Sequence, residues 1–315
     1  HKESTGKPVP PMPRGSKTKI KEMIMNYTIQ NEYLTVTASD AGAELQSIKS
    51  ADGTEYLWQA DPAFWRDKAP NIFPYVARLT NGTFIYDGNS YNMKIHGLTK
   101  YLTLEAEILT QDSMAFRLTS SDQTKAQYPF DFVYQITYTL KGSCLVITTS
   151  VENTGNERMY FAIGGHPGFN VPLEEGLSFE DYYLEFDRPS HPYQVGFSDT
   201  CFLTGEDHLY PLEDDRRIPL RHDLFDNDAI VLKHAPKTVR IASDKGHRSV
   251  TVHYPDFMYI GFWHAVKKDA PYVCVEPWSA LPSRDGIVED LSCQSDLTGL
   301  DAGKVYTNTW TIEIQ

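Results

Sequence analysis

The feature that most constrains the fold is an alternation of apolar and polar residues in many short segments. Apolar side chains occupy every second position of residues 132–140, and the turn-forming residues 141–143 lead into another such segment, residues 144–149. Alternation with a period of two places one face of a strand on a core and the other toward solvent. The helical period of about 3.6 residues is scarce, so the pattern favours an antiparallel β protein.

Further turns separate strands of the same kind. Residues 30–32 and 87–89 are polar turn sequences between alternating segments, and residues 244–246 separate 239–242 from 249–252. Gly, Asn and Asp are the residues that tight hairpin turns favour. No repeat of about 20–50 residues is present. We therefore expect an all-β fold, a large antiparallel β-sandwich, in which residues 25–315 form a single domain.

Two regions depart from the alternation. Residues 1–24 are rich in Lys, Pro and Ser, and we expect them to be a leader or an expression remnant outside the fold. Residues 170–235 carry many Pro and Asp, and we expect long loops that cross one face of the sheets. Loops of this kind are a common place for a binding site.

Composition excludes several classes of partner. Lys and Arg number 29 against 42 Asp and Glu, which gives a formal net charge of -13 and a pI of about 5.2. An acidic surface repels nucleic acid and anionic membranes, so we expect neither as a partner. We expect a cytoplasmic protein, monomeric or homodimeric, whose four widely spaced cysteines are reduced and hold no metal.

The most distinctive local sequence is residues 164–168, Gly-Gly-His-Pro-Gly. A backbone of Gly and Pro is selected for its shape, and here it presents a single imidazole. Because the pKa of histidine lies near neutrality, His166 is a candidate for proton transfer. Glu276 ends another alternating segment just before Pro277 and Trp278. Its apolar neighbours should raise the pKa of its carboxyl group, which suits a base that works near neutral pH.

Other polar residues stand out less, and each also has a purely structural explanation. Arg78 closes an apolar run, where it could pair with an acid at a strand end or donate to hydroxyl groups in a pocket. His96 precedes a glycine at a strand end, where a structural role is the more common one. Asp226 and Asp228 precede an apolar strand, and turn capping explains both.

The order of these residues carries more information than any one of them. Arg78, His-Gly at 96, Gly-His-Pro at 166, an Asp near 228 and Glu-Pro-Trp at 276 together resemble the aldose 1-epimerase (galactose mutarotase-like) family. The similarity is greatest to a bacterial branch that carries GGHP and EPW in place of NHxYFNL and ET. The resemblance spans roughly residues 26–314 and implies a galactose-mutarotase-like β-supersandwich with its site in a cleft over one large sheet.

The resemblance also implies roles for the site residues. His166 would be the general acid that protonates the ring oxygen of a sugar, and Glu276 the general base that takes the proton of the C1 hydroxyl. Arg78 and His96 would hold sugar hydroxyl groups and the region of the ring oxygen. Asp228 would accept hydrogen bonds from sugar hydroxyl groups, with Asp226 open as the alternative. Ring opening by an acid and a base requires no metal and no other cofactor, so we expect neither.

Three functions fit these features. The preferred interpretation is an aldose 1-epimerase, an isomerase acting on a free aldohexose. A hexose-6-phosphate 1-epimerase would need several cations beside His96 to bind the phosphate. The candidate cations are Arg66, Lys68, Lys94 and Lys100. A non-catalytic carbohydrate-binding or sensing protein would need only an aromatic cleft. The candidate stacking rings are Trp278, Phe169 and Trp263.

Overall fold

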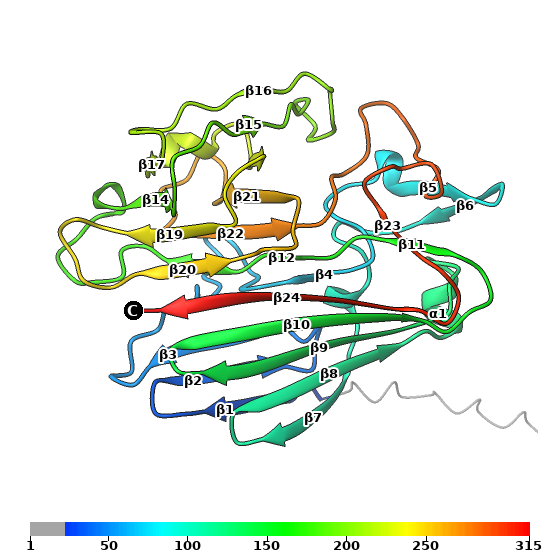
Figure 1. Cartoon of the computed structure of the whole chain (residues 1–315), viewed down its shortest axis with the longest axis horizontal. Coiled ribbons are helices and arrows are strands. Elements are labelled where there is room, and N and C mark those ends of the chain that lie inside the picture. The colour runs from blue at the N-terminus through cyan, green and yellow to red at the C-terminus, as the bar shows by residue number, and fades with distance from the viewer. Residues whose placement is uncertain (1–22) are drawn as a thin grey trace, which may run out of the picture.

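The alternating segments form strands as predicted in the computed structural model, which describes residues 23–315 (Figure 1). β9 (Phe132–Lys141) and β10 (Cys144–Asn153) pair antiparallel, and every second side chain of β9 is buried. The predicted hairpins also form: β1 (Asn26–Gln30) with β2 (Leu34–Ser39), β5 (Thr83–Tyr86) with β6 (Asn89–Asn92), and β19 (Thr238–Ala242) with β20 (Val250–His253). The prediction of a nearly all-β protein with large antiparallel sheets is confirmed. Residues 1–22 of the expected leader 1–24 lie outside the described residues.

Within residues 23–315, the larger sheet has nine strands, all paired antiparallel. Its order is β17 (Arg217–Pro219), β14 (Tyr183–Phe186), β19 (Thr238–Ala242), β20 (Val250–His253), β24 (Val305–Ile314), β10, β9, β8 (Ser113–Thr119) and β7 (Glu105–Thr110). The longest strands, β24, β10 and β9, lie side by side in the middle of this sheet.

The second large sheet carries eight strands in the described part of the chain. Its order is β16 (His208–Leu209), β15 (Tyr193–Gln194), β18 (Ile230–Lys233), β21 (Tyr259–Trp263), β22 (Tyr272–Trp278), β12 (Gly164–Gly165) and β4 (Asn71–Ile72), with β13 (Gly168–Asn170) also paired to β22. Every residue of β22 is buried, so this strand lies at the centre of the molecule.

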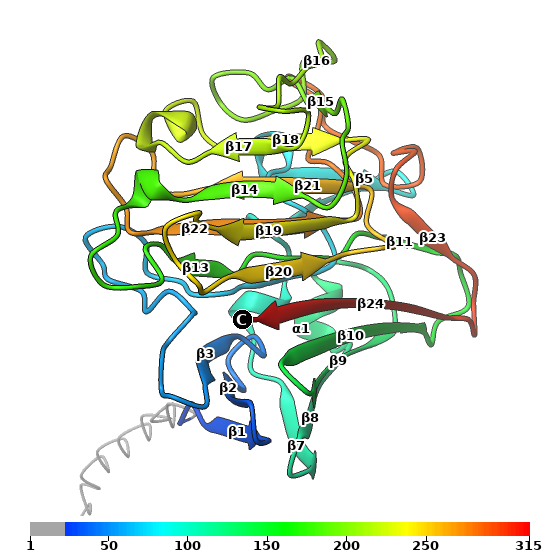
Figure 2. The same cartoon turned by 60° about the vertical axis from the view of Figure 1, so that its left-hand side comes forward.

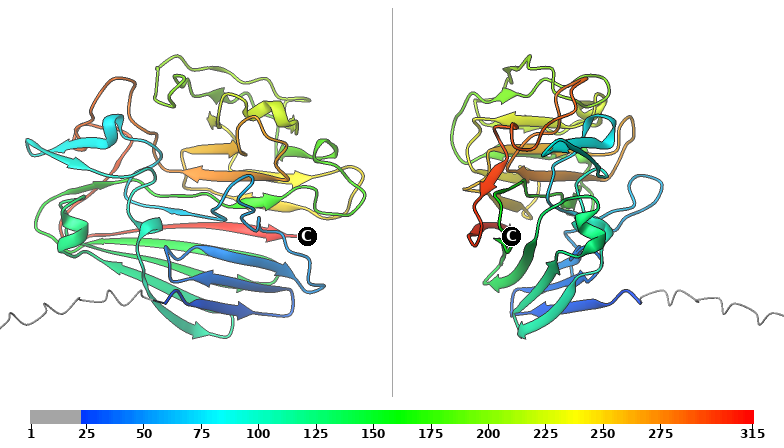
Figure 3. Two further views of the ribbon diagram at one scale, coloured as in Figure 1. Left: turned by 180° about the vertical axis from the view of Figure 1, so that it is seen from behind. Right: turned by 90° about the vertical axis from the view of Figure 1, so that its right-hand side faces the viewer.

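Small sheets and short helical turns complete the described chain. A three-stranded sheet packs beside β7 and β8, where the Tyr27 and Phe116 rings meet edge to face at 5.8 Å (Figure 3). It contains β1 (Asn26–Gln30), β2 (Leu34–Ser39) and β3 (Leu45–Ser50). Two-stranded pairs join β5 (Thr83–Tyr86) to β6 (Asn89–Asn92) and β11 (Met159–Phe161) to β23 (Thr298–Leu300). The helical turns are α1 (Asp122–Lys125), η1 (Thr80–Gly82), η2 (Thr99–Tyr101), η3 (Phe179–Asp181) and η4 (His222–Phe225).

The two large sheets lie face to face, with β14, β19 and β20 in front of β21 and β22 in Figure 2. One apolar cluster joins their inner faces, including Ile241 of β19 and Val273 of β22. The sheets approach so closely that a Cβ atom on Gly165 would lie 2.6 Å from the ring of Trp310 in β24. Glycine at this position of β12 is therefore a requirement of the packing.

The prediction for residues 170–235 is wrong in part. These residues contain β14 to β18 rather than loops alone. The strands are two to four residues long, which is too short for a visible alternation, and they are separated by segments rich in Pro and Asp. The loops between them do reach a cavity, as described below. Among the described residues, no helix has the length and apolar character needed to cross a bilayer.

Candidate active site

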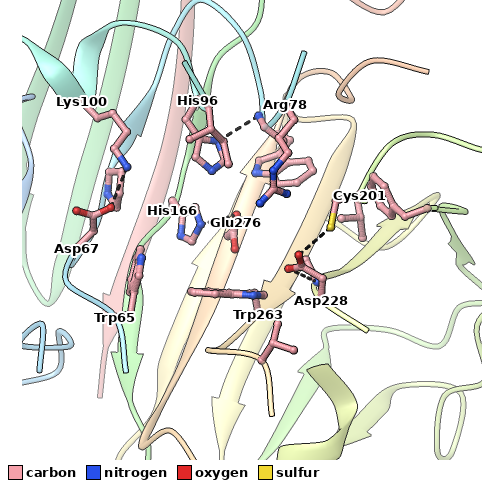
Figure 4. Close-up of a pocket in the computed structure, with 18 of the residues that line it drawn as sticks. Trp65, Asp67, Arg78, His96, Lys100, His166, Cys201, Asp228, Trp263 and Glu276 are labelled. Carbon is pink, nitrogen blue, oxygen red and sulfur yellow. Dashed lines mark hydrogen bonds and ion pairs between the residues drawn. The ribbon is translucent and has the colours of Figure 1, made fainter. Parts of the chain in front are cut away.

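A cavity of about 440 Å³ opens over the face of the eight-stranded sheet that carries Glu276 (Figure 4). This volume lies within the range of roughly 300–1,000 Å³ that is typical of small-molecule sites. The structure brings the five residues selected from the sequence into its wall: Arg78, His96, His166, Asp228 and Glu276. They come from five separate segments of the chain, so the fold itself assembles the group.

His166 and Glu276 meet because β12 and β13 follow β22 in one register. Antiparallel pairing sets Gly164 opposite Trp278 and Gly168 opposite Cys274. His166, midway between the two glycines, therefore faces Glu276. Its Nε2 atom lies 3.3 Å from Oε2 of Glu276, and the two side chains are 10% and 2% exposed. An acid and a base in direct contact can serve two oxygens bonded to one carbon.

Burial determines the charge of this pair. Loss of solvent raises the pKa of Glu276 well above its ordinary value, and the nearby charge of Asp228 raises it further. Burial lowers the pKa of His166, and the positive charge of Lys100 acts in the same direction. Both shifts favour the uncharged forms. The pair therefore shares one transferable proton, and the two shifts favour its place on Glu276.

His96 is fixed as a neutral imidazole at the cavity wall. The backbone N–H of Ala77 donates to Nδ1 of His96 over 3.1 Å, and the backbone N–H of His96 donates to the carbonyl of Ala77 over 3.0 Å. Because Nδ1 accepts, Nε2 carries the ring proton and is free to donate. Burial lowers the pKa of His96 well below its usual value, which maintains this neutral form.

Gly97 fixes the turn that carries His96. Its φ is +89°, and a Cβ atom there would lie 2.2 Å from the carbonyl oxygen of Phe73. We expect Gly97→Ala to lower the free energy of unfolding by more than about 1–3 kcal/mol, since backbone strain is joined by a steric clash. Gly53→Ala is a matched control, because Gly53 has a φ of +86° and nothing within 4 Å of the added carbon. Urea unfolding compares the two variants, and equal losses would rule out the clash.

Asp228, and not Asp226, lies at the cavity wall. The backbone N–H of Ala229 donates to its Oδ1 over 2.9 Å, and the thiol of Cys201 donates to its Oδ2 over 2.8 Å. Burial and the contact with Asp228 raise the pKa of Cys201 to about 11, so the thiol keeps the proton that it donates. Arg78 lies on the same side of the cavity (Figure 4). A fixed carboxylate and a guanidinium can together accept from and donate to hydroxyl groups.

Aromatic rings frame the acid–base pair. Trp65 lies over His166 with ring centroids 4.9 Å apart and planes inclined by 30°. Trp263 meets His166 edge to face at 5.7 Å. Of the rings that the sequence suggested for stacking on a sugar, Trp263 and Trp278 line the cavity, whereas Phe169 is fully buried in the core.

Trp65, Asp67 and Cys201 also line the cavity and were not predicted from the sequence. Lys100, which pairs with Asp67, was considered only as a cation for phosphate. Each lies in a connecting segment where no periodicity indicates direction. Trp65 ends a tight turn, in which its backbone N–H donates to the carbonyl of Asp61 over 3.1 Å. The tryptophan at this turn is the signal in the sequence that could have indicated a cavity wall there.

Comparison with known proteins decides the family. The sequence profile of the aldose 1-epimerase family matches residues 25–289. The chain belongs to the aldose 1-epimerase family. Among its relatives in that family is the plasmid-encoded protein LacX of Lactococcus lactis subsp. lactis, which is 33% identical over 291 residues. The match covers 89% of this chain and 97% of LacX, and the chromosomal LacX protein of the same organism matches equally well.

Solved structures of aldose-epimerase relatives share the fold. A galactose mutarotase related enzyme from Lactobacillus acidophilus matches with a TM-score of 0.88 and 34% identity, covering 92% of this chain and 97% of that one. A galactose mutarotase-like protein from Lactobacillus casei ATCC 334 matches with a TM-score of 0.87 and 29% identity, covering 92% of this chain and all of the other. The galactose-mutarotase-like fold expected from the sequence is confirmed.

One cluster among the described residues of this epimerase-family chain could offer ligands to a metal ion. A nitrogen of His166, the sulfur of Cys274 and an oxygen of Glu276 lie within 4.8 Å of one another, and all three residues are buried. Burial raises the pKa of Cys274 well above its usual value, which disfavours the thiolate that a metal binds. A metal would also occupy the lone pairs through which His166 and Glu276 exchange protons. The absence of a metal requirement stays a prediction.

Proposed function

We propose that the protein is an aldose 1-epimerase that interconverts the α and β anomers of a free aldohexose. The observation that supports this most directly is the 3.3 Å contact between Nε2 of His166 and Oε2 of Glu276 at the wall of the cavity. Anomer exchange needs one group that donates a proton to the ring oxygen and one that accepts a proton from the anomeric hydroxyl. Arg78, His96 and Asp228 provide donors and an acceptor for the remaining hydroxyl groups.

The reaction balances with protons alone. Glu276 takes the proton of the C1 hydroxyl while His166 gives its proton to the ring oxygen. The bond between C1 and the ring oxygen breaks, which leaves an aldehyde at C1 and a hydroxyl at C5. Rotation about the C1–C2 bond then exposes the other face of the aldehyde. Closure returns each proton by the reverse path and produces the opposite anomer.

Before this step the proton must move from Glu276 to His166, and the short contact between the two side chains allows that transfer. Burial favours neutral His166 and protonated Glu276. Transfer of that proton to Nε2 of His166 creates the acid and the base together without changing the net charge of the pair. The donors in the wall can offset the cost of the ionic form when a sugar is bound, since hydrogen bonds to charged groups are the stronger ones.

The same proton count predicts a bell-shaped pH dependence of kcat/KM. At low pH the pair takes up a second proton, and the lowered pKa of His166 puts this limb below the ordinary histidine value of 6.5. At high pH the pair loses its only proton, and the raised pKa of Glu276 puts that limb above the ordinary glutamate value of 4.5. Both limbs belong to the coupled pair. Mutarotation measured from pH 4 to 10 tests this, and a rate that only rises across the range would contradict it.

The cavity gives less support to a hexose-6-phosphate substrate. Of the four cations considered for phosphate, Lys100 is the one that lines the cavity in the described residues, and Asp67 neutralises it. Lys68 instead donates to the Gln59 side chain over 3.2 Å, and Lys94 lies 5.0 Å from the centre of the Tyr101 ring. A non-catalytic sugar-binding role would leave the contact between His166 and Glu276 without a purpose.

Polarimetry tests the proposal directly. Freshly dissolved α-anomers of D-glucose, D-galactose and D-mannose, and their 6-phosphates, are followed with and without protein. Acceleration of the free sugars over the spontaneous rate is the expected result. Acceleration of the 6-phosphates alone would favour the phosphosugar enzyme. Sugar binding by calorimetry without any acceleration would establish a binding protein in its place.

A further inference from the structure

The ion pair between Asp67 and Lys100 has no part in the proton chemistry, yet it lies in the same cavity. Nζ of Lys100 is 2.8 Å from Oδ2 of Asp67, and their side chains are 16% and 37% exposed. Among the ion pairs of Lys and Arg within residues 23–315, this is the one in which both residues line the cavity. The pair is only partly exposed, and both members line the cavity, so its charged groups are available to a bound molecule.

The pair lies at one end of the cavity, beyond His166 and away from Asp228. Figure 4 shows Lys100 and Asp67 on one side of His166, with Glu276, Arg78 and Asp228 on the other. The charges of Lys100 and Asp67 both act on His166. The two residues come from two short segments of the chain. Lys100 lies in η2, shortly after His96, and Asp67 lies shortly after Trp65. The same segments hold the rings on either side of His166.

The proposed mechanism orients the sugar relative to this pair, and the inference rests on that mechanism. His166 serves the ring oxygen and Glu276 serves the C1 hydroxyl, so the ring oxygen lies toward the Lys100 end. In an aldohexopyranose the ring oxygen is bonded to C5, and C5 carries the exocyclic C6 group. The C6 group therefore points toward Asp67 and Lys100, whereas the C2 and C3 hydroxyls point toward Asp228 and Arg78.

We propose that Asp67 and Lys100 form a subsite for the free C6 hydroxyl group of a neutral aldohexose. A hydroxyl is both an acceptor and a donor, so it can accept from the ammonium group of Lys100 while it donates to the carboxylate of Asp67. The pair carries no net charge. A phosphate or carboxylate at C6 meets the negative oxygens of Asp67, and Lys100, the cation that lines this end of the cavity in the described residues, is already paired with Asp67. The subsite selects a free hexose by attraction and rejects 6-phosphates and uronic acids by repulsion.

The experiment compares one hexose with two derivatives that differ only at C6. The hexose is whichever of D-glucose, D-galactose and D-mannose is turned over fastest, and the derivatives are its 6-deoxy and 6-phosphate forms. The wild-type protein should lose about 10–100-fold in kcat/KM on the 6-deoxy sugar, because hydrogen bonds to charged partners are lost. Asp67→Asn leaves Lys100 without its counter-charge, so the ratio of 6-phosphate to hexose kcat/KM should rise about 10–100-fold.

Two controls isolate the subsite. Asp131→Asn makes the same chemical change in a Lys–Asp pair outside the cavity, that of Asp131 with Lys125, and should leave both ratios unchanged. Adding Lys100→Met to Asp67→Asn should abolish the gain on the 6-phosphate. Equal kcat/KM for the hexose and its 6-deoxy form, or an unchanged ratio in Asp67→Asn, would overturn the inference.

Binding separates failure of the inference from failure of the proposed function. If the wild-type protein accelerates no sugar, the function fails, and calorimetric Kd values for the same three sugars then test the subsite. A Kd that is about 10–100-fold weaker for the 6-deoxy sugar, and an Asp67→Asn variant that gains affinity for the 6-phosphate, would support the subsite. Equal Kd values for the hexose and the 6-deoxy sugar would overturn it.

Discussion

Replacing Glu276 by glutamine should lower kcat for mutarotation by about 10²–10⁴-fold, the usual cost of losing a general base. Glutamine has nearly the shape of glutamate, so the packing of a side chain that is 2% exposed should survive. The amide cannot take the proton of the C1 hydroxyl. Sugar affinity should stay within about tenfold, because Arg78, His96 and Asp228 still hold the hydroxyl groups. Polarimetry gives kcat, and calorimetry gives Kd.

Glu289→Gln is the matched control for this variant. Glu289 is also a buried carboxylate, but it pairs with Arg284 and lies outside the cavity. Its substitution should leave kcat unchanged even if stability falls. Near-normal mutarotation in Glu276→Gln would show that Glu276 is a structural carboxylate at a strand end and that the assigned base is wrong.

Stability provides a second measurement on the same variant. The folded pKa of Glu276 is raised, so above the unfolded value of about 4.3 the folded state holds a proton that the unfolded state has lost. The stability gained from that proton is lost as pH rises through the folded pKa. Glutamine does not ionise, so the variant should lose less stability than the wild type as pH rises above about 4.3. Parallel Tm curves would contradict the raised pKa.

His166→Gln should produce a loss of similar size, about 10²–10⁴-fold in kcat, because the ring oxygen loses its proton donor. Glutamine can place an amide near the position of Nε2, which preserves a polar contact with Glu276 but transfers no proton. The variant should also change the pH profile, since both limbs belong to the coupled pair and glutamine cannot take up a proton. This change of profile separates a catalytic role from a structural one.

His253→Gln serves as the control for His166→Gln. His253 lies on β20 with Thr238 and Glu313 as partners and takes no part in the cavity. It should keep both kcat and the shape of the pH profile. If His166→Gln retains more than about a tenth of the wild-type kcat, another group donates the proton and the assignment of His166 fails.

The sequence could predict the strands of the fold and the residues that stand out from their surroundings. Alternation in β9 and β10 indicated their buried faces directly, and glycine around His166 marked an imidazole held by a special backbone. The contact between His166 and Glu276 depends on the register of β12 and β13 against β22. A register across more than a hundred residues leaves no local pattern, so the sequence could not show that distance.

Other residues of the site could not be predicted from the sequence for a different reason. Cys201 and Asp67 lie in irregular segments, where side-chain direction is set by individual turns rather than by a period. Cys201 adopts a φ of +68°, and Asp228, the residue it contacts, adopts +77°. Neither is a glycine, so composition gives no warning of these conformations. Such residues become visible only when the loops from both ends of the sheet are seen together.

β22 carries the core on one face and the cavity on the other. Val273 and Val275 belong to the apolar cluster between the sheets, whereas Cys274 and Glu276 lie on the opposite face, under and within the site. The effect of a substitution should therefore alternate along this strand between loss of stability and loss of activity. In a library of every single substitution from Tyr272 to Trp278, damage at Val273 and Val275 should appear as lost abundance of soluble protein. Substitutions at Glu276 should instead lower the rate of mutarotation while the abundance of soluble protein stays normal. Positions that determine stability and positions that determine activity therefore alternate along one strand.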